Sequence, residues 1–212
     1  MTPRTPVSAR FFMIVSLGTA LTLTACGNTT QPQSASPTDS ASASASVTGA
    51  PSPTSTAVYK PADAKGKAEK VPVPVLPEAA KANTKEGVEA FARYWFQALS
   101  YAYETGDTTI VDRISGPNCV FCTGLKDTIK VAWADGKWIV GGTLQTPSVS
   151  AKFVPGAESQ QATIQVIHQP VSIHKSDGTL YQEPTQGSNR ASQMVTRFDA
   201  NGWTAVDLGL IR

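Results

Sequence analysis

The chain has 212 residues, of which 41% are hydrophobic and 16% charged, and its formal net charge is +2 at pH 7. This length accommodates one domain and a tail. From residue 78 onward there are 12 Lys/Arg and 13 Asp/Glu residues, a near-neutral balance that lacks the basic footprint of a nucleic-acid-binding domain, so no nucleic-acid partner is expected.

The N-terminus has the pattern of a removable signal peptide. Arg4 and Arg10 precede an apolar run over 11–23, which at about 13 residues is too short to span a bilayer. Leu23-Thr-Ala-Cys26 follows directly. Over residues 1–27 the chain resembles bacterial lipoproteins, which implies a signal peptide over 1–25, cleavage before Cys26 and a diacylglyceryl group on its thiol. The alternative is an ordinary secretory signal followed by a chance cysteine.

A lipidated Cys26 predicts where the protein lies. Two acyl chains, such as palmitate, give stable attachment because each buried CH₂ contributes about 0.8 kcal/mol. The expected location is therefore the extracytoplasmic face of the cell membrane, with the membrane itself as a partner through the anchor.

Residues 26–77 are expected to form a disordered linker without helix or strand. Residues 27–57 are almost entirely small and polar, and such a composition cannot offset the entropy of ordering. Proline occupies every second or third position of residues 71–77, a pattern typical of polyproline II. The alanine- and threonine-rich linker resembles those of lipoproteins from high-GC Gram-positive bacteria. Its lysines either are simply solvated or touch an anionic envelope surface; they are Lys60, Lys65, Lys67 and Lys70.

The domain is expected over 78–212 and begins with helices. Asn83 and Glu86 have capping-box spacing, and apolar residues recur at helical spacing over 84–104. Gly106 is a typical residue just after a helix.

Two shorter helices are predicted next. Asp107 is suited to cap the first, which carries Ile110, Val111 and Ile114. The second runs over 119–134, with its apolar side at Leu125, Ile129, Val131, Ala132 and Trp133.

The apolar period then falls to two, which predicts strands. Their expected ranges are 144–154, 161–174, 191–199 and 203–211, with turns at 176–178 and 201–202. Helices followed by antiparallel strands predict an α+β domain, in which the helices pack on one face of a curved antiparallel sheet.

Several motifs resemble those of the cone-shaped nuclear-transport-factor-2-like domains, which implies that fold. They are Phe91-x-x-x-Trp95-Phe96, Ala134-Asp-Gly136-x-Trp138 and Gly202-Trp203.

A second resemblance is to an uncharacterised domain of actinobacterial lipoproteins. It rests on Ala90-Phe91-x-x-Tyr94-Trp95, Cys119-x-x-Cys122 and Gly141-Gly142. It implies attachment to the envelope and no established activity.

Cys119 and Cys122 are predicted to form a disulfide. An extracytoplasmic chain with two remaining cysteines usually pairs them, and a bond here would join the second helix to the third. The alternative is a redox pair, because a helix N-terminus lowers the pKa of a thiol. However, a thioredoxin-like site needs a preceding strand, and here helices come first.

The two histidines give little support for catalysis. His168 follows the apolar face of its strand, so it is a candidate for the mouth of a ligand cavity, whereas His174 is expected to face solvent. Asp207 is the only candidate acid partner for His168. Because side chains alternate along a strand, Asp207 is expected on the face opposite Val206 and Leu208, which argues against such a pair. No metal or cofactor is expected, since no third ligand accompanies the histidines.

Aromatic residues are the remaining candidates for a binding surface. Trp95 and Trp133 are expected in the core. Tyr94 and Tyr101 lie seven residues apart on one helix side, which is either a partner-binding stripe or the edge of an amphipathic helix.

The sequence therefore predicts a lipid-anchored, non-catalytic binding module, with an envelope protein as its partner. One alternative is a carrier that holds a small apolar ligand in the cone. The other is an enzyme of the cyclase or isomerase kind, which would need His168 inside the cavity.

Overall fold

The computed structural model describes residues 58–211. The predicted signal peptide, Cys26 and the linker up to residue 57 lie outside the described residues. Within the described part, no helix is both long and apolar enough to cross a membrane.

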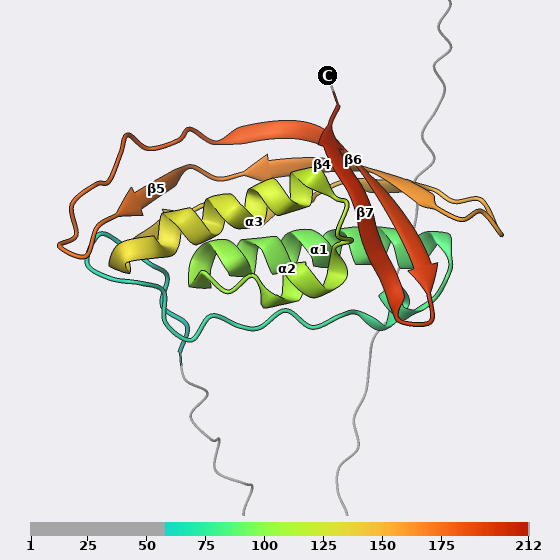
Figure 1. The fold of residues 1–212 in the computed structure, drawn as a ribbon, viewed down its shortest axis with the longest axis horizontal. Helices are drawn as coiled ribbons and strands as arrows, with labels where there is room; N and C mark the ends of the chain where they lie inside the picture. The colour runs from blue at the N-terminus through green and yellow to red at the C-terminus, as the bar shows by residue number, and fades with distance from the viewer. Residues whose placement is uncertain (1–57, 212) are drawn as a thin grey trace, which may run out of the picture. The chain divides into compact units, whose positions relative to one another are not determined.

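The helices come first, as predicted, and lie together on one side of the domain (Figure 1). They are the short 3₁₀ turn η1 (Glu78–Lys81), α1 (Lys85–Thr105), α2 (Thr109–Ile114), α3 (Val120–Trp133) and the 3₁₀ turn η2 (Ala134–Gly136).

The ends of α1 are set by local chemistry. The Thr84 hydroxyl accepts a hydrogen bond from the Gly87 amide at 3.0 Å, so the predicted capping box at Asn83 is wrong by one residue. At the other end Gly106 has φ +76°, a conformation that glycine adopts without penalty. A Cβ at Gly106 would lie 2.8 Å from the Trp133 ring.

Helix α3 buries a narrower face than predicted. Ile129 and Ala132 are buried as expected, whereas Val131 is 66% exposed. Trp133 is only half-buried, which corrects its assignment to the core. Its indole nitrogen donates to the Tyr103 carbonyl at 3.2 Å, which joins α3 to α1.

Within residues 58–211, seven strands form two antiparallel sheets. They are β1 (Trp138–Gly141), β2 (Leu144–Gln145), β3 (Val149–Lys152), β4 (Gln160–His168), β5 (Val171–His174), β6 (Ser188–Asp199) and β7 (Gly202–Leu210). The larger sheet has the order β2-β4-β6-β7, with β3 also paired to β4, and the smaller sheet joins β1 to β5. The expected arrangement of helices on a curved antiparallel sheet is confirmed.

The predicted strand over 161–174 is two strands that belong to different sheets. It breaks at Pro170, which has no amide proton for a ladder, and β5 then pairs with β1, a strand that the periodicity missed. Gly141 ends β1 with φ +79°. A Cβ there would lie 2.2 Å from the Pro170 carbonyl oxygen, so only glycine fits this crossing point.

The last strand also changes face, because β6 and β7 shift register between Val195 and Thr196. Trp203, Ala205 and Leu208 are all buried, so the inward parity changes at Val206. The predicted shared face of Val206 and Leu208 is therefore wrong. Such bulges place an extra residue on one strand and rotate those that follow.

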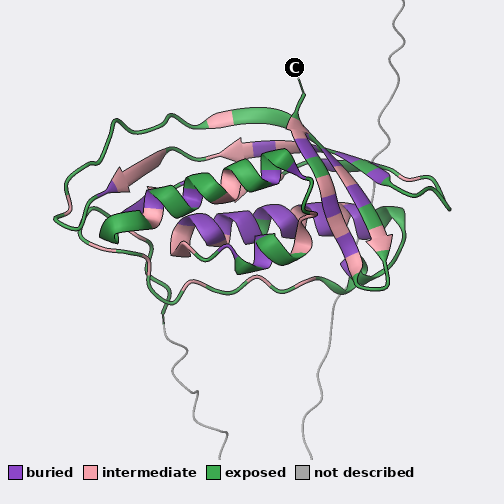
Figure 2. Ribbon diagram, viewed as in Figure 1, coloured by how far each residue is buried: buried purple, intermediate pink, exposed green. Residues whose placement is uncertain are grey.

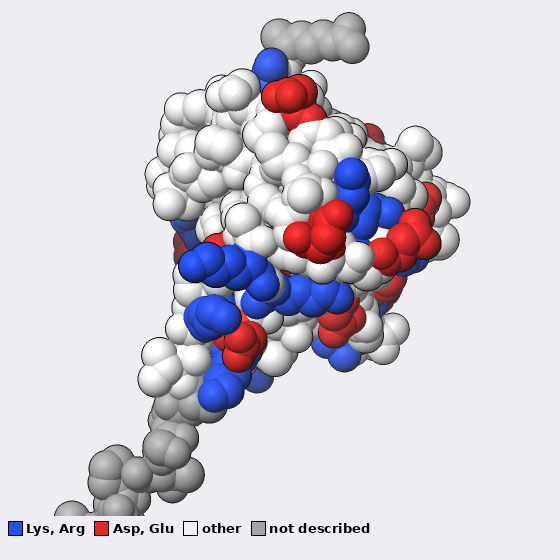
Figure 3. Space-filling model, turned by 90° about the vertical axis from the view of Figure 1, so that its left-hand side faces the viewer, with Lys and Arg blue, Asp and Glu red and all other residues white. Residues whose placement is uncertain are grey.

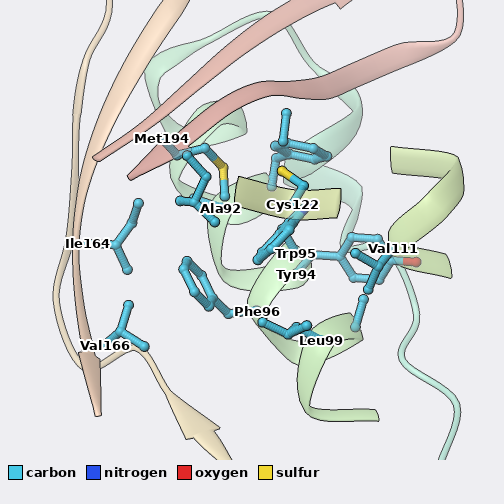
Figure 4. Close-up of a cluster of buried hydrophobic side chains, with 14 of the residues drawn as sticks. Ala92, Tyr94, Trp95, Phe96, Leu99, Val111, Cys122, Ile164, Val166 and Met194 are labelled. Carbon is cyan, nitrogen blue, oxygen red and sulfur yellow. The ribbon is translucent and has the colours of Figure 1, made fainter. Parts of the chain in front are cut away.

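The core lies between α1 and the concave face of the larger sheet (Figures 2 and 4). Apolar residues predicted for α1 are buried, among them Phe91, Trp95 and Leu99. Phe96 points from α1 toward Ile164 and Val166 of β4 (Figure 4). The interior of the cone is thus filled by side chains.

Residues 58–77 correct the expectation of a linker that is disordered up to residue 77. This segment runs along the domain from the C-terminal end of α1 to its N-terminal end (Figure 1). Tyr59 donates a hydrogen bond to Glu104 at 2.6 Å, and the Trp138 indole donates to the Asp63 carbonyl at 2.9 Å. Because the composition of residues 58–77 is typical of a linker, the sequence did not predict these contacts of Tyr59 and Trp138.

Candidate functional site

Cys119 and Cys122 lie at the start of α3 with their sulfur atoms 1.97 Å apart, at disulfide distance. Both residues are fully buried. The Cys119 sulfur also accepts a hydrogen bond from the Cys122 amide at 3.3 Å, so it caps the helix. A buried sulfur pair is poorly placed for thiol exchange, which requires access, and this favours the structural interpretation.

His168 lies at the end of β4 and is half-buried. Its ring faces Tyr103 of α1, with ring centres 5.2 Å apart. The Nε2 atom is buried without a hydrogen-bond partner among the described residues. Burial lowers the pKa of His168, and a backbone hydrogen bond with Gly142 opposes that shift. The residue thus faces inward as predicted, but against a packed helix.

His174 is buried, not solvent-facing as predicted. Pairing of β5 with β1 stacks its ring on Trp138, with centres 5.8 Å apart and planes inclined by 18°. Its Nδ1 lies 2.9 Å from the Gly178 carbonyl oxygen, and its Nε2 lies 3.2 Å from the Ser172 hydroxyl. Both nitrogens are satisfied, so His174 has a structural role.

Asp207 and His168 do not form an acid–base pair. Asp207 is exposed and pairs with Val195, whereas His168 pairs with Ser188. These two positions are separated by seven residues along β6, which corresponds to about 20 Å. Across residues 58–211, no group of three metal-ligating side chains is clustered.

A hollow of the described domain lies at the end where α1 begins, between η1, α2 and the β6–β7 turn. Its volume is about 1000 Å³. Its walls carry four aromatic residues: Phe91, Tyr94, Phe198 and Trp203. We call it the aromatic hollow; its other lining residues are Leu76, Ala80, Lys81, Arg113, Ile114, Asp199, Ala200, Asn201, Gly202 and Thr204.

Trp203 is the fixed centre of this wall. Its indole nitrogen donates to the Ala82 carbonyl at 3.1 Å. Phe198 meets its ring edge-on at a centre distance of 4.8 Å, and Phe91 lies tilted at 6.5 Å. These contacts hold the aromatic surface rigid before any ligand arrives.

Tyr94 connects the core to the hollow. It lies on the side of α1 opposite Ile164, near Val111 (Figure 4), and it is 4% exposed. Its hydroxyl makes no hydrogen bond within residues 58–211, although it is not among the fully enclosed polar atoms. Tyr94 thus offers a donor to the hollow, and this favours a binding role for it over that of an amphipathic edge.

The charged lining residues differ in their availability. Lys81 is paired with Glu78 at 2.5 Å, and the Asp199 carboxylate accepts from the Asn201 amide at 2.7 Å. Arg113 is exposed on α2 and forms no ion pair with any other described residue. Among residues 58–211, the guanidinium of Arg113 is therefore a cation of the hollow that has no ion-pair partner.

Sequence reasoning missed this site because its parts come from four separate segments. Tyr94 was singled out, but Arg113 and Trp203 gave no motif that linked them. The Asn201-Gly202 turn was the available signal, since it brings Phe198 and Trp203 together.

The opposite end of the domain carries mixed charge. Basic and acidic side chains alternate across it (Figure 3). Lys60 pairs with Glu69 at 2.9 Å and Lys137 with Asp135 at 3.1 Å, while Lys67 lies 5.2 Å from the centre of the Trp133 ring. This end is therefore a patchwork of local pairs rather than one basic surface.

Comparison with known proteins identifies a family for which no activity is established. A family described as being of unknown function (DUF6318) matches residues 57–209. No curated protein matches the sequence.

Two solved structures are similar at the level of the fold. The intermembrane-space region of the chloroplast protein ARC6 aligns with 9% identity and a TM-score of 0.42, over 60% of this chain and 96% of that chain. A nuclear-transport-factor-2-like protein with a cystatin-like fold, from Novosphingobium aromaticivorans, aligns with 17% identity and a TM-score of 0.36, over 56% of this chain and 77% of that chain.

Proposed function

The chain belongs to the DUF6318 family of unknown function, and we propose that it is a non-catalytic binding module held at the cell envelope by a lipid on Cys26. Its binding site is the aromatic hollow. The observation that carries this proposal is a preformed aromatic wall, fixed by the Trp203 hydrogen bond to Ala82, beside the Arg113 guanidinium, which forms no ion pair within the part of the chain that the structure describes.

Ligand sites are typically concave, largely apolar and supplied with a few polar groups. The aromatic hollow has these properties. In contrast, a carrier or a cyclase would use the interior of the cone, where Trp95, Phe96 and Met194 are packed. His168, which an enzyme of that kind would need inside a cavity, faces Tyr103.

The path of residues 58–77 supports presentation of the hollow away from the anchor. Tyr59 bonds Glu104 at the C-terminal end of α1, whereas Leu76 lines the hollow beside the N-terminal end of that helix; the segment between them runs along the domain (Figure 1). Helix α1 has 21 residues and is about 30 Å long at 1.5 Å per residue. A tether that arrives at residue 58 therefore joins the domain about 30 Å from its binding site.

The proposal is tested by photocrosslinking in intact cells. A photoreactive phenylalanine analogue replaces Asn201 at the hollow of the full chain, and the control carries it at Thr163, an exposed residue of β4. The proposal predicts one discrete adduct from position 201 that is absent from position 163 and lost on adding Cys26→Ser. Equal labelling at both positions, or none at 201, would overturn it.

A further inference from the structure

We propose that the aromatic hollow binds a small organic acid, with the carboxylate on Arg113 and a planar apolar body against Phe198, beside Trp203. This inference rests on the proposed function, because it names the ligand of the same site. The proposed ligand follows from the lining side chains, some of which already have hydrogen-bond or ion-pair partners while others have none among the described residues.

The wall of the hollow selects a flat apolar group. The Trp203 nitrogen is committed to Ala82 and the residue is only 5% exposed, so Trp203 forms the base of the wall and supplies no donor. Phe198 packs edge-on against it and is half-buried, so it is the ring available for stacked or edge-to-face contact with a ligand. Gly202, beside Trp203, leaves open space where a side chain would otherwise project.

The free polar groups select an anion. On α2, Asp112 is paired with Lys126 at 2.7 Å, so the neighbouring Arg113 is left without a carboxylate partner among the described residues. A guanidinium matches a carboxylate through two parallel hydrogen bonds. The Tyr94 hydroxyl is a second donor that makes no hydrogen bond within residues 58–211, and a carboxylate oxygen can accept from it.

Asp199 is the acidic residue in the lining. Its carboxylate accepts from the Asn201 amide, so it stabilises the β6–β7 turn and at the same time opposes an anionic ligand. This arrangement predicts opposite effects from two substitutions. Removing the charge of Arg113 weakens acid binding, and removing that of Asp199 strengthens it.

The test compares 4-phenylbutyrate with the neutral 4-phenylbutan-1-ol, which shares its aromatic body, by isothermal titration calorimetry on the full chain. We expect the acid to bind about fivefold more tightly, as for a partly exposed ion pair. Arg113→Gln should abolish this preference, and Tyr94→Phe should reduce it. Asp199→Asn should increase affinity for the acid alone. The control Arg190→Gln changes an exposed arginine of β6 that does not line the hollow and should retain the preference.

Three other results of these titrations would count against the inference. Equal affinity for acid and alcohol overturns this inference but leaves the proposed binding site intact. An equal loss with Arg190→Gln and Arg113→Gln also overturns it, because the effect would then be one of net charge. If neither compound binds, this inference fails, whereas the hollow as the binding site is judged separately by the crosslinking from position 201.

Discussion

Replacing Tyr59 by Phe should loosen the segment that separates the tether from the hollow. Tyr59 donates to the Glu104 carboxylate at 2.6 Å. A hydrogen bond to a charged acceptor contributes about 1.5–3 kcal/mol when sheltered, but Tyr59 is 41% exposed. Solvent screening reduces this to about 0.5–1 kcal/mol, which increases the population of the detached segment about two- to fivefold.

Hydrogen exchange measures this opening directly. The Trp138 indole donates to the Asp63 carbonyl at 2.9 Å, so exchange of the indole proton reports whether the segment is attached to the domain. Tyr59→Phe should accelerate this exchange and leave the α1 amides unchanged. Tyr181→Phe is the matched control, since Tyr181 is 50% exposed and its hydroxyl bonds no other described residue. Unchanged exchange in Tyr59→Phe would refute the reasoning.

The same contact has a pH signature. Burial, then the hydrogen bond to Glu104, raises the pKa of Tyr59 from 10.0 to about 12. A raised folded-state pKa gives stability that is present below pH 10.0 and is lost as the pH rises through the folded value. Burial also raises the pKa of Tyr103, so ultraviolet titration should show two late-ionising tyrosines, and Tyr59→Phe should remove one of them.

Two further substitutions test packing and protonation. Gly106→Ala should lower the free energy of unfolding in urea by about 1–3 kcal/mol, because it combines a positive φ with a clash on Trp133. In the control Gly124→Ala the new methyl group meets no neighbour, so this change should be neutral or stabilising. Burial lowers the pKa of His168, so the unfolded chain takes up its proton first and stability should fall as the pH drops from about 7 to about 5. His168→Phe should flatten that slope, and an unchanged slope would contradict the assignment.

Much of the fold was predictable because long amphipathic segments dominate it. Helix α1 follows one apolar stripe that ends at Gly106, so its limits were recognisable from local chemistry alone. Strand β1 was missed because it has only four residues, and its partner β5 is set by tertiary contacts. The bulge at Val206 depends on register with β6, which sequence periodicity does not encode.

The candidate site was less predictable for a physical reason. Proline and lysine between residues 58 and 77 are typical of a linker, and their packing depends on Trp138 and Glu104, which are distant in the chain. The aromatic hollow likewise exists only after η1, α2 and the β6–β7 turn meet. Tyr94 was visible in the sequence, but its free hydroxyl was not.

Chemical-shift mapping tests the central claim, that ligands bind in the aromatic hollow and not inside the cone. The full chain is titrated with 4-phenylbutyrate, and amide and indole signals are followed by NMR. The account predicts shifts confined to η1, residues 91–94 of α1, α2 and residues 198–204, with the Trp203 indole among the largest. Shifts centred on His168 and Tyr103, or spread over the outer sheet face, would contradict it.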